Sequence, residues 1–245
     1  MHNTVKEKIA LIVCSTKGLG FCVAALLAKQ NYRIILTGRS LSDLKKANEQ
    51  LENPGKHIIF SGDFLEEKTL LNLFELDLFP DVIIHTLGEK IEGDQQPLIE
   101  KVLKASIAIN LGVATNINAH YLPLMQEKKF GRIIHISSDA SITGLSAPGY
   151  AASKAAINAY VKSTARYYAK DNIMICAVLP GIFLHGDSDW DRKRINNPEH
   201  YQKKLLDMPL KRFLDVNEIA ELIVEIATST NMAYAGSLVK LTGAC

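Results

Sequence analysis

The chain alternates short runs of β-type residues with longer helical patterns along most of its length. Runs that are apolar at consecutive positions, and so on both faces, suit strands covered by helices on either side, as in a doubly wound parallel sheet. Right-handed crossovers between parallel strands further limit the topology. The sequence therefore predicts an α/β fold, with strands near residues 9–13, 33–36, 57–61, 81–85, 131–137, 173–178 and 238–241.

Composition favours a single domain that spans residues 1–245. The 245 residues are 47% hydrophobic, which is enough to bury a large core, and neither a linker nor an internal repeat divides them. The net charge is +2 and the charged residues are dispersed, so we expect no nucleic-acid partner. The N-terminus has no apolar signal core, and no apolar stretch approaches the ~18 residues that span a bilayer. We therefore expect a cytoplasmic protein with no membrane partner.

Tyr150 and Lys154 form the first candidate chemical pair. Residues four apart at the start of a helix share one face, so the two side chains can interact. A phenol titrates near ~10, and a neighbouring ammonium and a bound cationic nicotinamide would both favour the phenolate and lower that pKa. Tyr150 would then be a usable general acid. The same spacing is also common on exposed helix faces, so other segments must support this interpretation.

Ser138 supplies that support from the end of a predicted strand. It lies twelve residues before Tyr150, at the carboxyl edge where open α/β sheets bind ligands. Two hydroxyls that meet there can hold a carbonyl oxygen, one by a hydrogen bond and the other by proton transfer. Taken alone, Ser137 and Ser138 could simply be polar residues at a strand end.

These residues together resemble the active site of the short-chain dehydrogenase/reductase family, which joins an Asn, a Ser and a Tyr-x-x-x-Lys in that order. Asn110, Ser138, Tyr150 and Lys154 match that pattern. The resemblance runs from Lys8 to about Gly243 and implies a Rossmann-type sheet of about seven strands in the order 3-2-1-4-5-6-7. It also implies that Asn110 positions a water linking Lys154 to solvent, and that Tyr150 and Lys154 contact the bound nicotinamide cofactor.

A glycine-containing turn after the first predicted strand is the candidate phosphate site. Helix N-termini attract phosphates through free amides and the helix dipole, and glycines allow the backbone to approach closely. The family has a further glycine where this chain has Cys14, so either Cys14 tolerates the turn or the pyrophosphate sits slightly differently. The candidate contacts are Ser15, Thr16, Lys17, Gly18, Leu19 and Gly20.

The choice of nicotinamide cofactor depends on the end of the second strand. NAD sites place an acidic residue there and NADP sites a base. This chain has Arg39 and no carboxylate before Asp43. Arg39 and Lys17 could converge on a 2′-phosphate, although each could also be an ordinary solvated side chain. The sequence predicts NADP(H), with NAD(H) possible.

The resemblance implies further cofactor contacts. Asp63 matches the family's adenine-side Asp, and Gly88 is retained from its Asn-Ala-Gly segment, where His85 and Thr86 replace the two Asn residues. A nicotinamide-side turn is matched by Pro180 and Gly181. His185 replaces the Thr that usually follows; it could contact the cofactor, or the next segment could simply start differently.

Residues 182–212 form a long charged stretch that we interpret as an irregular substrate lid. Its charge suggests a polar or acidic substrate, such as a sugar derivative, a carrier-linked acyl group or a phosphorylated metabolite, although charged loops are usually just solvated. The chain is similar to 3-oxoacyl-carrier-protein reductases, so both small-molecule and carrier-linked substrates are considered.

The predicted helix from Tyr150 to Ala165 carries small and apolar residues on more than one face, which indicates burial on two sides. Family members pair this helix and the preceding one, here around 106–124, with a partner subunit. The resemblance therefore implies a homotetramer, with a dimer as the second choice. Cysteines and histidines are scattered without metal-ligand spacing, so no metal site is expected.

The resemblance implies an NADP(H)-dependent oxidoreductase that interconverts a carbonyl and a secondary alcohol. Tyr150 would act as general acid/base, and Ser138 would hold the oxygen. One alternative is an NAD-dependent alcohol or sugar dehydrogenase, against which Arg39 argues. Another is a non-catalytic dinucleotide-binding sensor or scaffold, which would suit the departures at Cys14 and His185 but would not need the phenol.

Overall fold

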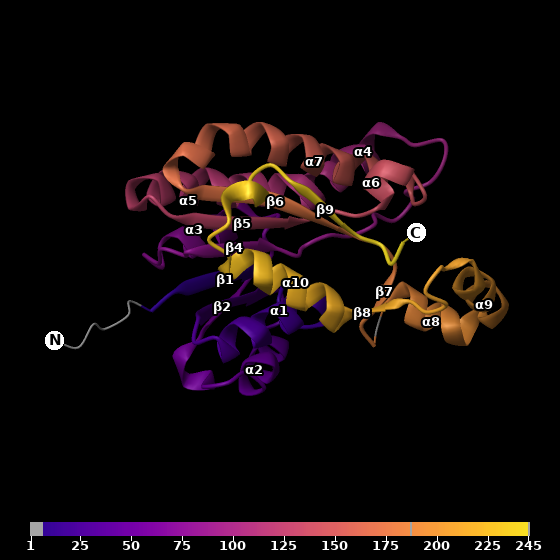
Figure 1. Ribbon diagram of the computed structural model, residues 1–245, viewed down its shortest axis with the longest axis horizontal. Coiled ribbons are helices and arrows are strands. Elements are labelled where there is room, and N and C mark those ends of the chain that lie inside the picture. Colours follow the sequence, from indigo (N-terminus) through magenta and orange to yellow (C-terminus); the bar gives the residue numbers. More distant parts are fainter. Residues whose placement is uncertain (1–6, 187, 245) are drawn as a thin grey trace.

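The computed structural model describes residues 7–186 and 188–244. Their core is a seven-stranded parallel sheet of order β3-β2-β1-β4-β5-β6-β9 (Figure 1). Its strands are β1 (Ile9–Val13), β2 (Arg33–Gly38), β3 (Ile58–Ser61), β4 (Val82–His85), β5 (Gly131–Ile136), β6 (Ile173–Pro180) and β9 (Leu238–Leu241). The predicted fold class and strand order are confirmed. The seventh strand is β9 because β7 (Phe183–Leu184) and β8 (Leu214–Asp215) pair separately.

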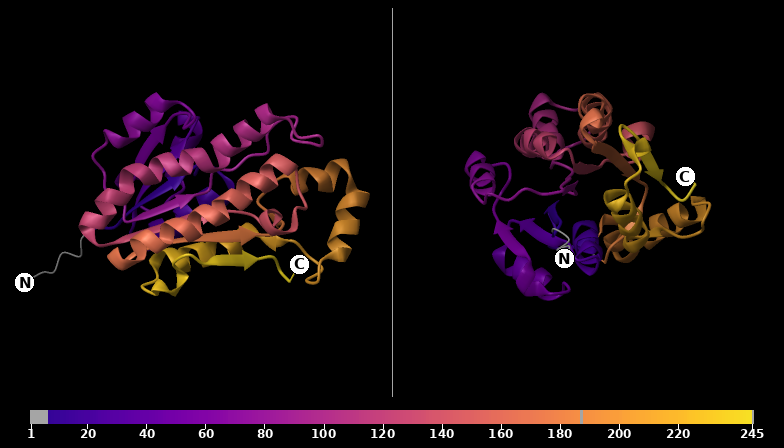
Figure 2. Two further views of the ribbon diagram at one scale, coloured as in Figure 1. Left: turned by 90° about the horizontal axis from the view of Figure 1, so that it is seen from above. Right: turned by 60° about the vertical axis from the view of Figure 1, so that its left-hand side comes forward.

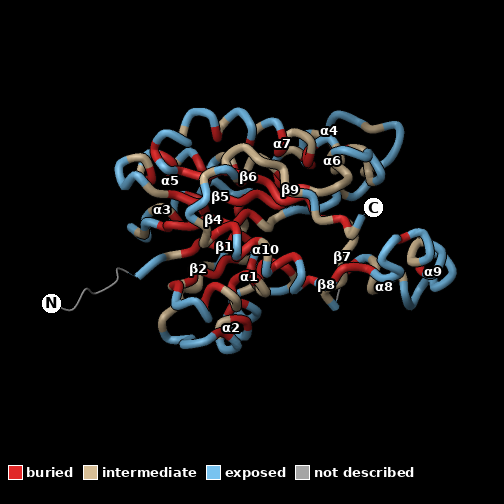
Figure 3. The backbone as a smooth tube through the Cα atoms, viewed as in Figure 1, coloured by how far each residue is buried: buried red, intermediate tan, exposed pale blue. Residues whose placement is uncertain are grey.

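The two faces of the sheet bury alternate residues of the same strands. Ala10 and Ile12 of β1 pack with α1 (Gly18–Lys29) and α10 (Val216–Thr228). Leu11 and Val13 pack instead with α5 (Val113–Lys128) and α7 (Pro148–Tyr168). Figures 1 and 2 show these helix layers on opposite sides of the sheet, and Figure 3 shows the central strands as the most buried part. Side chains alternate along a strand, so apolar runs serve both layers.

The remaining helices complete the two layers. Leu44 of α2 (Leu41–Glu49) joins the α1 side, and Leu73 of α3 (Glu67–Phe74) joins the α5 side. A π turn, Ala108–Gly112, connects α4 (Glu100–Ile107) directly to α5, and α6 (Ala140–Thr143) precedes α7. None of the helices in the described ranges is both long and apolar enough to span a bilayer.

The segment expected to be an irregular lid is helical, so that part of the prediction is wrong. It forms α8 (Asp189–Asn196) and α9 (Pro198–Asp207), which project beyond the sheet in Figure 1. A capping box between Ser188 and Asp191 begins α8, and the Asn197 side chain caps α9. Apolar residues of the segment form a small cluster of their own, which includes Trp190, Tyr201, Met208 and Phe213. Asp187 lies outside the described residues.

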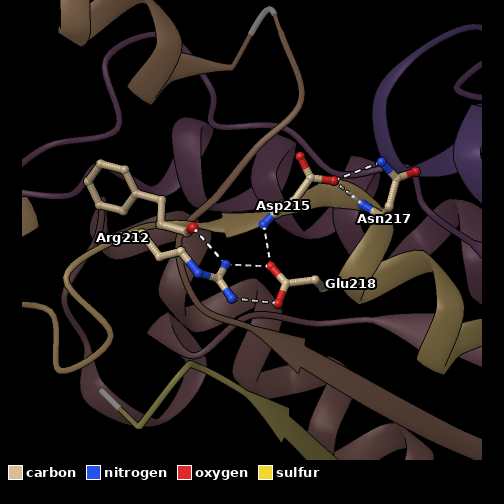
Figure 4. Close-up of polar contacts among 5 residues, drawn as sticks. Arg212, Asp215, Asn217 and Glu218 are labelled. Atoms are coloured by element: carbon tan, nitrogen blue, oxygen red, sulfur yellow. Dashed lines mark hydrogen bonds and ion pairs between the residues drawn. The ribbon is translucent and has the colours of Figure 1, made fainter.

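The chain leaves this segment through a polar network at the start of α10 (Figure 4). The Arg212 guanidinium donates to both carboxylate oxygens of Glu218, at 2.6 and 2.9 Å. Glu218 also accepts from the backbone N–H of Asp215 at 2.8 Å, which completes a capping box. The ion pair with Arg212 holds the pKa of Glu218 low, at about 2. A capped helix therefore stands at each end of this segment.

Candidate active site

Tyr150 and Ser138 meet at the carboxyl edge of the sheet, as predicted. Ser138 follows β5 and Tyr150 lies in the first turn of α7, and their hydroxyls are joined by a hydrogen bond. Both residues line a cleft of about 840 Å³. The turn after β6, with Pro180 and Gly181, forms another wall of this cleft. The geometry can hold a carbonyl oxygen between two hydroxyl groups.

Lys154 lies under this pair with its charge buried. Lys154 is only 2% exposed. Its ammonium donates to the Ile136 carbonyl at 2.7 Å and lies 5.6 Å from the centre of the Tyr150 ring. Burial lowers the pKa of Lys154 from 10.5 to about 8. A Cβ added at Gly88 would come within 2.7 Å of the Lys154 Nζ, which explains a glycine here.

The expected lowering of the Tyr150 pKa is wrong for the protein alone. Burial raises the pKa of the phenol, and the hydrogen bond from Ser138 lowers it by a smaller amount. Desolvation disfavours the phenolate, and it outweighs the nearby hydroxyl. The ammonium of Lys154 is directed at a backbone carbonyl rather than at the phenol oxygen.

Asn110 lies in the π turn between α4 and α5 and is 2% exposed. Its amide donates to the carbonyls of Glu89 and Ser106, both at 2.9 Å, and accepts from the Glu89 N–H at 3.1 Å. The side chain therefore holds the backbone of Glu89, the residue after Gly88. Gly88 itself lies close to the Lys154 ammonium. Its predicted role in positioning a water stays a prediction.

Asp94 is a positioning residue that the sequence analysis missed. Its carboxylate accepts from the backbone N–H groups of Gly149 and Tyr150, at 2.7 and 2.8 Å. These are free amides in the first turn of α7, where an anion also interacts favourably with the helix dipole. A Cβ at Gly149 would lie 2.9 Å from Asp94. Asp94 is 55 residues from Gly149 in the chain, so no local pattern could indicate the contact.

The glycine turn has the geometry of a phosphate cradle. Gly18 has φ +58°, and a Cβ at Gly20 would lie 2.0 Å from the Cys14 carbonyl oxygen. No side chain caps the N-terminus of α1, so its first amides remain available for a ligand. Cys14 itself adopts φ 71°, the left-handed region that its family glycine would favour. Cysteine therefore adopts the backbone conformation of this turn, and the position of the pyrophosphate stays a prediction.

The backbone of Cys14 is held on both sides. Its N–H donates to the Thr37 hydroxyl at 2.9 Å, and its carbonyl accepts from the Thr86 hydroxyl at 2.8 Å. Thr86 thus ties β4 to the turn after β1. Ser15 uses both its N–H and its hydroxyl on Thr37, so it shapes the turn, and direct contact of Ser15 with a cofactor stays a prediction. Burial raises the pKa of the Cys14 thiol.

The predicted 2′-phosphate residues lie close to this turn. Arg39 and Lys17 both act electrostatically on Cys14, where their charges oppose the rise in the pKa of the thiol. Asp63 follows β3 and accepts from the Leu65 N–H at 3.0 Å. His185 lies over Gly18, with Nδ1 3.4 Å from where a Cβ would be. That nitrogen is buried and has no hydrogen-bond partner among the described residues.

The turn after β1 and the residues around it suit the phosphates of a dinucleotide. Phosphate oxygens would meet one surface here. It is made of the glycine turn, the uncapped N-terminus of α1 and the His185 nitrogen that has no hydrogen-bond partner among the described residues. They lie beside the carboxyl ends of β1 and β4, at the point where the strand order reverses. The residues present therefore fit a dinucleotide. Within the described ranges, no group of three or more His, Cys, Asp or Glu residues could hold a metal.

A family model described as short chain dehydrogenase matches residues 8–194. The chain therefore belongs to the short-chain dehydrogenase/reductase family of oxidoreductases. It is 25% identical over 252 residues to the 3-oxoacyl-[acyl-carrier-protein] reductase FabG of Aquifex aeolicus, covering 99% of both chains. It is also 25% identical over 257 residues to 7alpha-hydroxysteroid dehydrogenase of Paraclostridium sordellii, covering 98% and 92%.

Solved structures extend this similarity to three dimensions. A 3-oxoacyl (acyl-carrier-protein) reductase from Agrobacterium tumefaciens, crystallised with NADP bound, matches with a TM-score of 0.88 at 25% identity, covering 97% of this chain and 94% of that one. The chain is 25% identical both to a 3-oxoacyl-[acyl-carrier-protein] reductase and to a 7alpha-hydroxysteroid dehydrogenase. Sequence identity therefore favours neither of these two substrates.

Proposed function

We propose that this protein is an NADP(H)-dependent oxidoreductase that interconverts a carbonyl group and a secondary alcohol. The proposal rests on the hydrogen-bonded hydroxyls of Tyr150 and Ser138 beside the buried ammonium of Lys154. A sensor or scaffold that only binds a dinucleotide has no use for this arrangement. The fit of the glycine turn to phosphates supports the cofactor class.

In the proposed reaction, a bound nicotinamide would supply or accept the hydride. The Ser138 hydroxyl holds the carbonyl oxygen, and the Tyr150 phenol donates its proton to that oxygen as the carbon is reduced. A positive charge on Lys154, in a site of low dielectric, stabilises the phenolate that remains. Lys154 contacts the nicotinamide ribose, and Asn110 holds the backbone next to it. The reverse sequence oxidises the alcohol.

The preference for NADP(H) over NAD(H) rests on Arg39 and Lys17. Both cations lie near Cys14 in the phosphate turn, where a 2′-phosphate gains from a bidentate guanidinium and a nearby ammonium. The pyrophosphate would be held by the turn residues Thr16, Gly18, Leu19 and Gly20 together with His185. The adenine-side and nicotinamide-side contacts would come from Asp63, Gly88, Pro180 and Gly181.

Tyr150→Phe tests the proposed chemistry. The variant keeps the ring but loses the proton, so we expect NADPH oxidation with a panel of carbonyl compounds to fall at least about a hundredfold, while NADPH affinity stays within about twofold. Tyr234→Phe is the matched control, because it makes the same exchange at a half-buried tyrosine that lines neither the cleft nor the groove over α5 and α7. Retention of most activity by Tyr150→Phe would refute the assignment.

Cofactor choice is tested separately by the ratio of kcat/KM with NADPH and NADH. We expect NADPH to be preferred in the native protein, and Arg39→Ala to reduce that preference. A native preference for NADH would favour the alternative of an NAD-dependent alcohol or sugar dehydrogenase.

We further propose that the protein works in the cytoplasm as a homotetramer, with a dimer as the second choice. A groove of about 580 Å³ runs over the outer faces of α5 and α7, and its lining includes Thr115, Ala119, Leu122, Tyr160 and Tyr167. Analytical ultracentrifugation at micromolar concentration tests this state; a monomer alone would remove it.

A further inference from the structure

Among the residues that the structure describes, the cleft that contains Tyr150 is lined by more cations than anions. Its lining includes two carboxylates, those of Asp139 and Asp189, and three ammonium groups, those of Lys90, Lys193 and Lys204. The charges come from four different segments of the chain, so the excess is a property of the assembled cleft. This excess of positive charge indicates which charge a substrate carries away from its carbonyl group.

Both carboxylates already have partners. Asp189 pairs with Lys193 at 3.0 Å and with Arg192 at 3.9 Å, and these contacts keep the pKa of Asp189 below its ordinary value. Asp139 pairs with Lys240 at 3.2 Å. Neither Lys90 nor Lys204 has a carboxylate within ion-pair distance among the described residues. Lys90 also contributes to the lowered pKa of Asp189 from beyond ion-pair distance. Lys90 and Lys204 therefore line the cleft with no ion-paired carboxylate among the described residues.

Lys90 is held near the reacting phenol. Its Nζ lies 5.9 Å from the centre of the Tyr150 ring, within the range of a cation–π contact. Asn110 grips both backbone groups of the preceding residue, Glu89. Four residues further on, Asp94 fastens the same segment to the start of α7. The backbone that carries Lys90 is therefore anchored on both sides of it.

Lys204 lines the same cleft from a different segment of the chain. It lies on α9, is half-buried and lines the cleft near Trp190 and Met208. The neighbouring Lys203 is exposed and does not line the cleft. An ammonium at this position attracts an anion that enters the cleft.

We propose that the substrate of this enzyme is a carbonyl compound that carries an anionic group, a carboxylate or a phosphate, bound by Lys90 and Lys204. The inference rests on the proposed function, because it assumes that Tyr150 and Ser138 hold the carbonyl oxygen. An ammonium is a compact point charge that suits either anion. Ile182, Phe183 and Trp190 also line the cleft and would contact the carbon chain.

Matched substrate pairs test the proposal. Short 3-oxo acids are compared with their methyl esters, and phosphorylated ketoses with the free sugars, by kcat/KM with NADPH. The anionic member should be favoured by ~10-fold or more, and Lys90→Gln and Lys204→Gln should each reduce its kcat/KM ~10- to 100-fold. The same variants should change the neutral member and the Kd for NADPH less than about twofold. The two sets of pairs separate a carboxylate from a phosphate.

The controls are Lys203→Gln on α9 and Lys101→Gln on α4, both at exposed positions outside the cleft. Equal turnover of charged and neutral partners, or equal losses for both in the lysine variants, would overturn the anionic subsite while leaving the reaction class intact.

A second measurement covers the case in which no compound is turned over, which would count against the proposed function itself. Isothermal titration of malonate and of inorganic phosphate into the protein with NADP⁺ should show binding of at least one anion that the Lys90→Gln/Lys204→Gln protein loses by at least tenfold. Equal affinity in both proteins would overturn the inference whatever the turnover.

Discussion

Replacing the buried ammonium of Lys154 should stabilise the protein. Burial lowers the pKa of Lys154 from 10.5 to about 8, and each unit corresponds to about 1.4 kcal/mol, so the charged form costs the folded state about 3 kcal/mol at pH 7. Lys154→Met removes that cost but leaves the Ile136 carbonyl without its donor, which costs about 1 kcal/mol. The net gain of about 2 kcal/mol should raise Tm by about 4 °C.

The gain should also depend on pH in a defined direction. Between pH 8 and 10.5 the folded protein holds Lys154 neutral, while the unfolded chain still binds the proton. Native stability therefore rises with pH across this window, and the advantage of Lys154→Met should shrink. Urea unfolding at pH 7 and pH 9.5, followed by circular dichroism, measures both effects.

The control for this experiment is Lys45→Met, which exchanges the same residue types at an exposed position of α2 and should change stability by less than about 0.5 kcal/mol. The reasoning fails if Lys154→Met is no more stable than Lys45→Met at pH 7. It fails equally if the advantage of the variant is undiminished at pH 9.5.

Three further predictions concern the surroundings of the site. Asp94→Asn should cost about 1 kcal/mol in urea unfolding and lower kcat, whereas Glu92→Gln in the same exposed segment should do neither. Gly20→Ala should abolish the thermal shift produced by NADPH, because its Cβ would strike the turn, while Gly55→Ala meets no atom within 4 Å and should keep it. Glu218→Gln should lower the urea midpoint at pH 6; since the folded pKa is about 2 against 4.5, the difference should diminish as pH falls from 4.5 towards 2.

The sheet could be predicted well because its strands are apolar on both faces. The bounds expected for β1 and β9 are those observed, and β2 and β6 extend a little beyond the expected runs, to Gly38 and Pro180. Those last residues pair with Ser61 and Leu241, and pairing of this kind depends on a neighbour distant in sequence. The strand order came from the family resemblance and not from local patterns.

The site could be predicted only at the positions that match the family motif. The meeting of Ser138 with Tyr150 was foreseen, whereas Asp94 was not, because its partners are distant in sequence. In the protein alone the pKa of Tyr150 is raised, because burial, which needs coordinates, outweighs the hydrogen bond with Ser138. The lowering expected with a bound nicotinamide stays a prediction. The helices α8 and α9 were missed although Ser188 and Asn197 are recognisable caps. None of the residues of α8 is buried, so no apolar periodicity indicated a helix there.

The apolar contacts inside the lid have a consequence for how this enzyme could change. Trp190, Tyr201, Met208 and Phe213 pack mainly with one another, apart from the two large clusters that surround the sheet. Losses within that small cluster would therefore leave the cofactor-binding scaffold standing. Grafting α8 and α9 from a relative should transfer preference for a new compound while the reduction chemistry is retained. In laboratory evolution these two helices could therefore be varied without changing the rest of the fold.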